Sequence, residues 1–348
     1  MSLPTLWFLL QIVLWCGYLT LEGFDFGVGL CLALIGRKER ERHAILSTIT
    51  PIWDGNEVWV ITAGGAMFAA FPGWYATTFS TFYIPLLAIL FGLIIRNVAF
   101  EYREHHDNPT WRRNWDLCII AGSFLPALLW GVAFGNIVRG LPIGADHEFT
   151  GSLLTLLNPF ALLAGLVTLF LFVTHGAVFL ALKTTDDLRL RAKRVATISG
   201  MITAVLAIVF LVWLNLLDGI NNNGLVLIFS VITALALVFG LGMHLLNRDG
   251  WSFVGTAVTV TAAVVTLFSS LYPRLFPSTT NPAYSLTIHN SSASHYTLTI
   301  MTWSAVILVP IILAYQAWSY WIFRKRITLP PLDVDAAASR PVTAAPAK

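Results

Sequence analysis

The sequence predicts an all-α polytopic membrane protein with about nine transmembrane helices. Of its 348 residues, 57% are hydrophobic and only 11% are charged, whereas soluble domains carry about 25% charged residues. Apolar stretches long enough to span a bilayer recur along most of the chain. We expect the helices to form two four-helix bundles plus one extra helix. The expected spans are 5–34, 55–72, 76–98, 115–136, 159–182, 195–217, 224–246, 252–272 and 299–323.

The first two stretches differ from an average span. The first is longer than a bilayer requires, so we expect this helix to tilt or to project beyond the membrane. No basic region precedes it, and its apolar run is too long for a signal peptide, so we expect it to be a true membrane helix. The second is short and rich in glycine and alanine. Such small residues let helices approach closely, so we expect this segment to be buried among its neighbours.

The basic residues indicate how the chain is oriented. All of the 21 lysines and arginines except Arg139 and Arg274 lie in or beside one alternate set of connections, or in the C-terminal tail. Connections rich in such residues stay in the cytoplasm, so the N-terminus is predicted outside and the C-terminus in the cytoplasm. Nine spans agree with this parity. We expect a single transmembrane domain over 1–326 and a cytoplasmic tail over 327–348, whose Pro- and Ala-rich sequence predicts disorder.

Four carboxylates lie inside or beside the first two apolar stretches. Glu22 and Asp25 lie within the first, and Asp54 and Glu57 lie at the start of the second. A charged carboxylate in hydrocarbon is costly, and such groups usually have a function. Each pair has i, i+3 spacing, so its members share one helix face. With the predicted orientation, the four acids form a ladder from the cytoplasm toward the bilayer centre, which is the geometry of a proton-uptake path.

Several of these residues also have a structural interpretation. Asp54 followed by Glu57 resembles a capping box at the start of a helix. Asp25 has the alternative of a buried acid that the backbone or a partner helix satisfies. Arg96, near the cytoplasmic end of the third span, is expected to snorkel or to pair with an acid. Asp116 is expected to lie at the interface.

The sequence offers few ligands for a cofactor or a metal. His175 is the one histidine well inside an apolar stretch, and a membrane haem usually needs axial ligands from facing helices. We therefore expect His175 to be a packed, hydrogen-bonded residue. The three cysteines lack a metal-binding or redox spacing, so no metal is expected. No basic patch is interleaved with aromatic residues, so nucleic acid is not an expected partner.

Motifs along most of the chain identify a family. The chain closely resembles subunit II of the cytochrome bd-type quinol oxidases. The clearest motifs are Glu-Gly-Phe-Asp-Phe-Gly-Val-Gly and Trp-Asp-Gly-Asn-Glu-Val-Trp, which contain the four acids. The matching stretches are 22–29, 53–59, 61–66, 122–126, 131–136, 157–165, 301–303 and 309–312.

The resemblance implies a respiratory enzyme of the prokaryotic plasma membrane. Such oxidases oxidise quinol and reduce O2 to water without pumping protons, and they take the protons for water from the cytoplasm. Two b-type haems, the d-type haem and the quinol-oxidising loop belong to subunit I, the expected heterodimer partner. Subunit II resembles it in fold but binds no haem, and it is expected to stabilise subunit I and to supply a proton path. A structural quinone, small accessory subunits and lipid are further expected ligands or partners.

The resemblance also implies roles for single residues. Asp54 matches the aspartate implicated in proton entry toward subunit I, and Asp25 matches the second acid of the first motif. Glu22 stands where aspartate is common, and Glu57 stands where some relatives have glutamine. Trp59 matches a tryptophan near a proposed oxygen entrance, with packing as the alternative.

Two other classes of function fit parts of the pattern. Intramembrane acids and nine or more spans are also typical of a proton-coupled secondary transporter, which would act without a haem partner. A purely structural assembly subunit is the third hypothesis. In that case the acids only pack and cap, and replacing Asp25 or Asp54 by asparagine would leave turnover intact.

Overall fold

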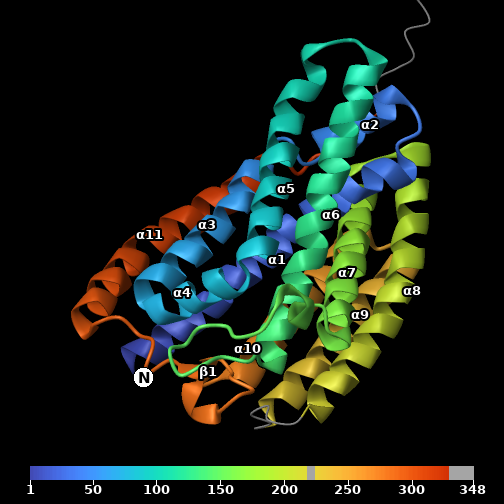
Figure 1. The fold of residues 1–348 in the computed structure, drawn as a ribbon. Coiled ribbons are helices and arrows are strands. Elements are labelled where there is room, and N and C mark those ends of the chain that lie inside the picture. Colours follow the sequence, from blue (N-terminus) through green and yellow to red (C-terminus); the bar gives the residue numbers. More distant parts are fainter. Residues whose placement is uncertain (218–223, 329–348) are drawn as a thin grey trace, which may run out of the picture.

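The computed structural model describes residues 1–217 and 224–328, and most of them are helical (Figure 1). Residues 329–348, which make up most of the predicted tail, lie outside this range. One small antiparallel sheet, β1–β2, belongs to the loop before the last long helix. The elements are α1 (Leu3–Ile35), α2 (Glu39–Ser47), α3 (Trp53–Ala70), α4 (Pro72–Thr81), α5 (Tyr83–Tyr102), η1 (Arg103–His105), α6 (Pro109–Arg139), η2 (Leu153–Leu156), α7 (Pro159–Lys183), α8 (Asp186–Leu216), α9 (Leu225–Leu245), α10 (Asp249–Leu271), β1 (Arg274–Phe276), η3 (Pro282–Tyr284), β2 (Leu286–Thr287) and α11 (His295–Ile322).

The helices form two groups of four with one helix added. Helices α7, α8, α9 and α10 pack against one another, and α1, α3, α5 and α6 form the other group. The two groups meet where α1 and α6 pack on α7. Helix α11 packs mainly along α1 and α3, on the far side from α8 (Figure 1). The predicted all-α fold is therefore confirmed, and the grouping of the long helices agrees with the predicted two bundles plus one helix.

Within the described residues, eight helices are long and apolar enough to cross a membrane. The second predicted span is present as α3, but the polar residues Asp54, Asn56 and Glu57 lower its hydropathy, so it is not among the eight. Nine crossings therefore stays a prediction. The third predicted span was wrong at its start, because α4 ends at Thr81 and α5 begins at Tyr83. Pro85 explains the break, since it has no N–H to donate and its ring crowds the carbonyl four residues earlier.

The first and last described residues lie at opposite ends of the molecule. The Trp7 indole, near the start of α1, donates a hydrogen bond to the carbonyl of Leu298 at the start of α11 (3.3 Å). At the other end, the amide of Ile327 donates to the carbonyl of Lys183, the last residue of α7 (2.7 Å). Figure 1 shows the N-terminus at the end opposite α2. This placement of the first and last described residues is what an odd number of crossings between them requires. Which end faces the cytoplasm stays a prediction.

Helix α1 crosses the middle of the molecule and contacts helices of both groups. Its closest approach is to α7 at Gly27, where an added Cβ would lie 1.9 Å from the carbonyl oxygen of Phe172 and 2.8 Å from the Cα of Gly176. Only glycine fits such a contact, as is typical of small-residue packing between membrane helices. The crossing leaves residues 22–32 of α1 buried, which places Glu22 and Asp25 inside the protein.

Candidate functional site

Glu22 and Arg96 form a fully buried ion pair between α1 and α5. Nη1 of Arg96 donates to Oε1 of Glu22, and neither side chain is exposed. The guanidinium also lies 4.8 Å from the ring centroid of Phe26 and 5.2 Å from that of Phe100. Such cation–π contacts stabilise a buried cation. The expectation that Arg96 pairs with an acid is confirmed.

Asp25 lies one helical turn further along α1 and contacts α3. Its Oδ2 accepts a hydrogen bond from Nδ2 of Asn56 (2.7 Å), and both side chains are fully buried. Asp25 precedes the end of α1 by ten residues, which is about 15 Å at the helical rise of about 1.5 Å per residue. The carboxylate is therefore well inside the helical part of the protein.

Glu57 is the half-buried acid of α3. Both of its oxygens accept from Nδ2 of Asn97 on α5, at 2.9 and 2.7 Å. Glu57 and Asp25 thus extend from neighbouring helices, and Asn56, the residue before Glu57 in the chain, bonds to Asp25. The structure brings Glu22, Asp25 and Glu57 into one region between α1, α3 and α5.

Asp54 is exposed in the first turn of α3. The capping-box interpretation of Asp54 and Glu57 is wrong, because the N-cap residue is Ile52 and no side chain caps this helix. A backbone carbonyl of the preceding turn satisfies the first amide instead, since the amide of Trp53 donates to Ile49. An acid in the first turn is still favoured by the helix dipole.

Several buried polar atoms of this region have no hydrogen-bond partner among the described residues. They are Oε2 of Glu22, Oδ1 of Asp25, Nε and Nη2 of Arg96, and Oδ1 of Asn97. Buried polar groups usually bond to protein or to ordered water, and internal water occupies polar sites of this kind. The free oxygens of Glu22 and Asp25 are positions where a proton can be accepted.

Trp59 lies on α3 with its ring against α1. A Cβ added to Gly17 would lie 2.2 Å from this ring, so the ring occupies space that only glycine leaves free. The geometry agrees with the packing interpretation of Trp59. Its part in an oxygen path stays a prediction.

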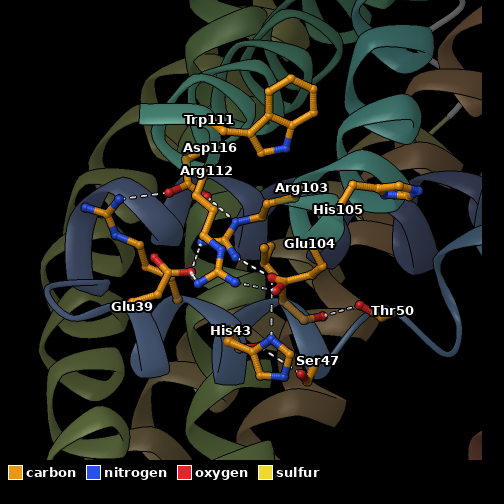
Figure 2. A network of polar contacts seen from close by, with 12 residues as sticks. Glu39, His43, Ser47, Thr50, Arg103, Glu104, His105, Trp111, Arg112 and Asp116 are labelled. Carbon is orange, nitrogen blue, oxygen red and sulfur yellow. Dashed lines mark hydrogen bonds and ion pairs between the residues drawn. The ribbon is translucent and has the colours of Figure 1, made fainter. Parts of the chain in front are cut away.

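A second group of charges lies at the α2 end of the molecule (Figure 2). Asp116 accepts from Arg42 (2.8 Å) and from Arg103 (2.6 Å), and Arg103 also pairs with Glu39 (2.8 Å). Only 3% of Asp116 is exposed, and its expected position at the membrane interface stays a prediction. The buried carboxylate of Asp116 is stabilised because two arginines from other segments pair with both of its oxygens. These pairs tie α2 to η1 and α6.

Glu41 of α2 forms a related contact with α8. It pairs with Arg191 (2.7 Å) and accepts from the backbone amides of Arg37 and Lys38. Burial alone would raise the pKa of this carboxyl, but the Arg191 bond and the two amides outweigh it and lower the pKa to about 2. Glu41 is therefore an ionised residue that anchors α2 to α8.

Four uncharged residues of the site were not predicted: Asn56, Asn97, Gln316 and Tyr320. The last two lie on α11, and both bond to Asn56. The signal that could have found them is an amide inside an apolar stretch, since such a group needs a partner in the membrane. The partner itself is not visible in the sequence, because Asn56 and Tyr320 are 264 residues apart.

His175 has no ring nitrogen free to ligate a haem iron. Nδ1 of His175 bonds to the hydroxyl of Thr256 (2.8 Å), and its Nε2 bonds to the carbonyl of Thr20 (3.2 Å). Both nitrogens are engaged, and the ring stacks on Phe253, so His175 is a packed, hydrogen-bonded residue as expected. Within residues 1–217 and 224–328, no group of three His, Cys, Asp or Glu side chains is arranged to hold a metal ion.

Fold and site together define a multi-pass helical membrane protein with charged residues buried between the helices of its first group. Residues 3–323 match the family described as cytochrome bd terminal oxidase subunit II, and the chain belongs to this family. It is a subunit of a quinol:O2 oxidoreductase complex in a bacterial membrane. This assignment decides between the oxidase subunit and the secondary transporter in favour of the oxidase.

Curated relatives agree with the family. The chain is 40% identical to a probable cytochrome oxidase subunit 2 of Haemophilus influenzae, over 90% of this chain and 92% of that protein. It is 39% identical to cytochrome bd ubiquinol oxidase subunit 2 of Bacillus subtilis, over 94% and 97%. The bd oxidase structure from Geobacillus thermodenitrificans superimposes with a TM-score of 0.76, covering 92% of this chain and 99% of that one. At 17% identity, this likeness shows the fold.

Proposed function

We propose that this chain supports the haem-bearing subunit I of its oxidase and supplies it with protons taken up from the cytoplasm. The observation that carries the proposal is that Asp25 and Glu22 are buried acids close to the start of α3. Asp25 bonds to Asn56 in the first turn of α3, and Asp54 of the same turn is exposed. Buried acids without full pairing are costly, and in membrane proteins they mark ion and proton paths.

The path begins at Asp54, whose exposed carboxylate takes a proton from water. Glu57 lies three residues further along the same helix face. From Asp54 a proton passes beside Glu57, without needing its carboxylate, to the free Oδ1 of Asp25 and then to Glu22, one turn away on α1. Arg96 keeps the negative charge at Glu22 balanced between transfers. Internal water is proposed to join these oxygens.

The proposed partner carries the redox chemistry. By the family resemblance, subunit I holds two b-type haems and the d-type haem, oxidises quinol and reduces O2 to water, and this chain holds no haem. A structural quinone on this chain and small accessory subunits stay predictions from the resemblance. The predicted orientation, with the α2 end in the cytoplasm, agrees with the basic residues at that end.

The experiment replaces Asp25 and Asp54 separately by asparagine in the complete oxidase. Quinol-driven oxygen uptake is expected to fall about tenfold or more, since a missing proton donor slows the steps that need it, while reduced-minus-oxidised spectra show unchanged haem content. The matched control is Asp187→Asn, because Asp187 is an exposed acid in the first turn of α8. Normal uptake in both Asp25→Asn and Asp54→Asn would favour the purely structural subunit.

A further inference from the structure

We infer that Gln316 and Tyr320 of α11 are positioning residues for Asp25, which they orient through the amide of Asn56. The inference rests on the proposed function of Asp25 and adds a part for the last helix. Neither residue touches Asp25's free oxygen. Their effect is on the direction in which Asn56 presents its hydrogen-bond donor.

Asn56 is held by three hydrogen bonds from two helices. Its Oδ1 accepts from Nε2 of Gln316 (3.0 Å) and from the hydroxyl of Tyr320 (2.8 Å). Its Nδ2 donates to Oδ2 of Asp25 (2.7 Å). Oxygen and nitrogen of an amide are told apart by their partners. The ionised Asp25 can only accept, so it directs Nδ2 of Asn56 at Oδ2, and Gln316 and Tyr320 then donate to Oδ1 of Asn56.

The two α11 residues are placed for this task by their spacing. Gln316 and Tyr320 are four residues apart, so they lie on one face of the helix. Across α11, whose residues are all described, only Leu298 is buried, and Gln316 and Tyr320 are half-buried on the face toward α1 and α3. The Tyr320 ring also packs edge-on against Phe24 of α1 (6.4 Å). The amide and the phenol are therefore the polar contacts that α11 makes with the acid region.

The orientation of Asn56 controls the protonation of Asp25. A carboxylate accepts hydrogen bonds and cannot donate, so an NH2 group directed at Oδ2 favours the charged acid. If Asn56 turned by 180°, its oxygen would face Asp25 and would accept a hydrogen bond from the protonated acid. Gln316 and Tyr320 oppose that turn, because both donate to Oδ1 of Asn56. They also leave Oδ1 as the oxygen of Asp25 that takes up a proton.

Other charged groups face Asp25 and are not altered by changes on α11. Glu22 lies on the same helix, Glu57 on α3 and Arg96 on α5. On α7, His175 directs its nitrogens at Thr20 and Thr256 and makes no bond to Asp25. Gln316→Leu removes no titratable group, so a change in the pH dependence of this variant reports on the amide.

The test measures the pH profile of quinol-driven oxygen uptake in the complete oxidase. The variants are Tyr320→Phe, Gln316→Leu and the double variant. Releasing Asn56 favours protonated Asp25, so the profile should move to higher pH, by about one unit in the double variant. Tyr315→Phe is the matched control, because this tyrosine of the same helix is 63% exposed. A purely structural loss would lower uptake at every pH without moving the profile.

Two outcomes overturn the inference. One is an unmoved profile in the double variant with normal haem content. If the double variant loses haem, the single Tyr320→Phe decides, because it removes one oxygen atom and keeps the ring. The other is normal turnover in Asp25→Asn, which removes the proposed function as well. Reduced turnover in Asp25→Asn with an unmoved profile in the α11 variants would overturn this inference alone.

Discussion

Arg96 on α5 donates its hydrogen bond to Glu22 on α1 in a place where neither side chain reaches solvent. The pair joins two residues that are 74 positions apart in the chain. One further oxygen of Glu22 and two nitrogens of Arg96 have no partner among the described residues. An ion pair in low dielectric that is not fully satisfied stabilises little by itself, yet breaking it is costly.

Removing one partner of this pair should destabilise the protein strongly. We expect Arg96→Leu to cost about 3–5 kcal/mol, because it leaves Glu22 buried without a counter-charge. The double variant Glu22→Leu with Arg96→Leu should recover most of that loss, since no isolated charge remains. Thermal unfolding of the purified complex measures both. An equal loss in the single and double variants would contradict this account.

The α1–α7 crossing should reject even one methyl group. Gly27→Ala places a Cβ against the backbone of α7, where no side chain can move aside, so the helices must separate. We expect a loss of about 1–3 kcal/mol or failure to assemble. The control is Gly65→Ala, because Gly65 of α3 has open space around its Cβ position. Recovery of assembled complex from membranes, followed by its melting temperature, distinguishes the two variants.

Glu57→Gln should be milder than Asp25→Asn. Glutamine keeps an oxygen that accepts from Nδ2 of Asn97, so the contact between α3 and α5 survives, and the sequence resemblance places glutamine here in some relatives. We expect oxygen uptake to stay within about threefold of wild type, well short of the loss expected when a proton donor is missing. A loss as deep as that of Asp25→Asn would make Glu57 an obligatory proton carrier.

The Glu41–Arg191 contact should make stability depend on pH. The folded pKa of Glu41 is lowered to about 2, below the unfolded value of about 4.3. The carboxylate therefore stabilises the fold above pH 4.3, and this contribution is lost as the pH falls toward 2. We expect Glu41→Gln to lower the melting temperature at pH 7 by about 2–4 °C, for a contribution of about 1 kcal/mol.

The difference between wild type and Glu41→Gln should shrink as the pH falls below 4.3. Glu101→Gln serves as the control, because Glu101 is an exposed acid of α5 at the same end of the molecule. A difference in melting temperature between wild type and Glu41→Gln that stays constant over the whole pH range would rule out this linkage.

The apolar stretches and the four acids were predictable because both depend on local sequence. A run of apolar residues forms a membrane helix wherever it inserts, and an acid within it is visible by its position. The break between α4 and α5 was also in principle local, since Pro85 causes it. The mean hydropathy of α3 is low because its first turn contains the polar residues of the site. The same residues that point to a functional site therefore make α3 harder to recognise as a membrane span.

By itself, the sequence determined that this is a helical membrane protein, which family it resembles, and which acids lie near the first two spans. Only the tertiary structure decided their partners: Arg96 for Glu22, Asn56 for Asp25, and α11 for Asn56. The physical reason is that hydrophobic length acts along the chain, whereas the partner of a buried polar group is the nearest one in space. That neighbour depends on how all the helices pack, including residues 264 positions away.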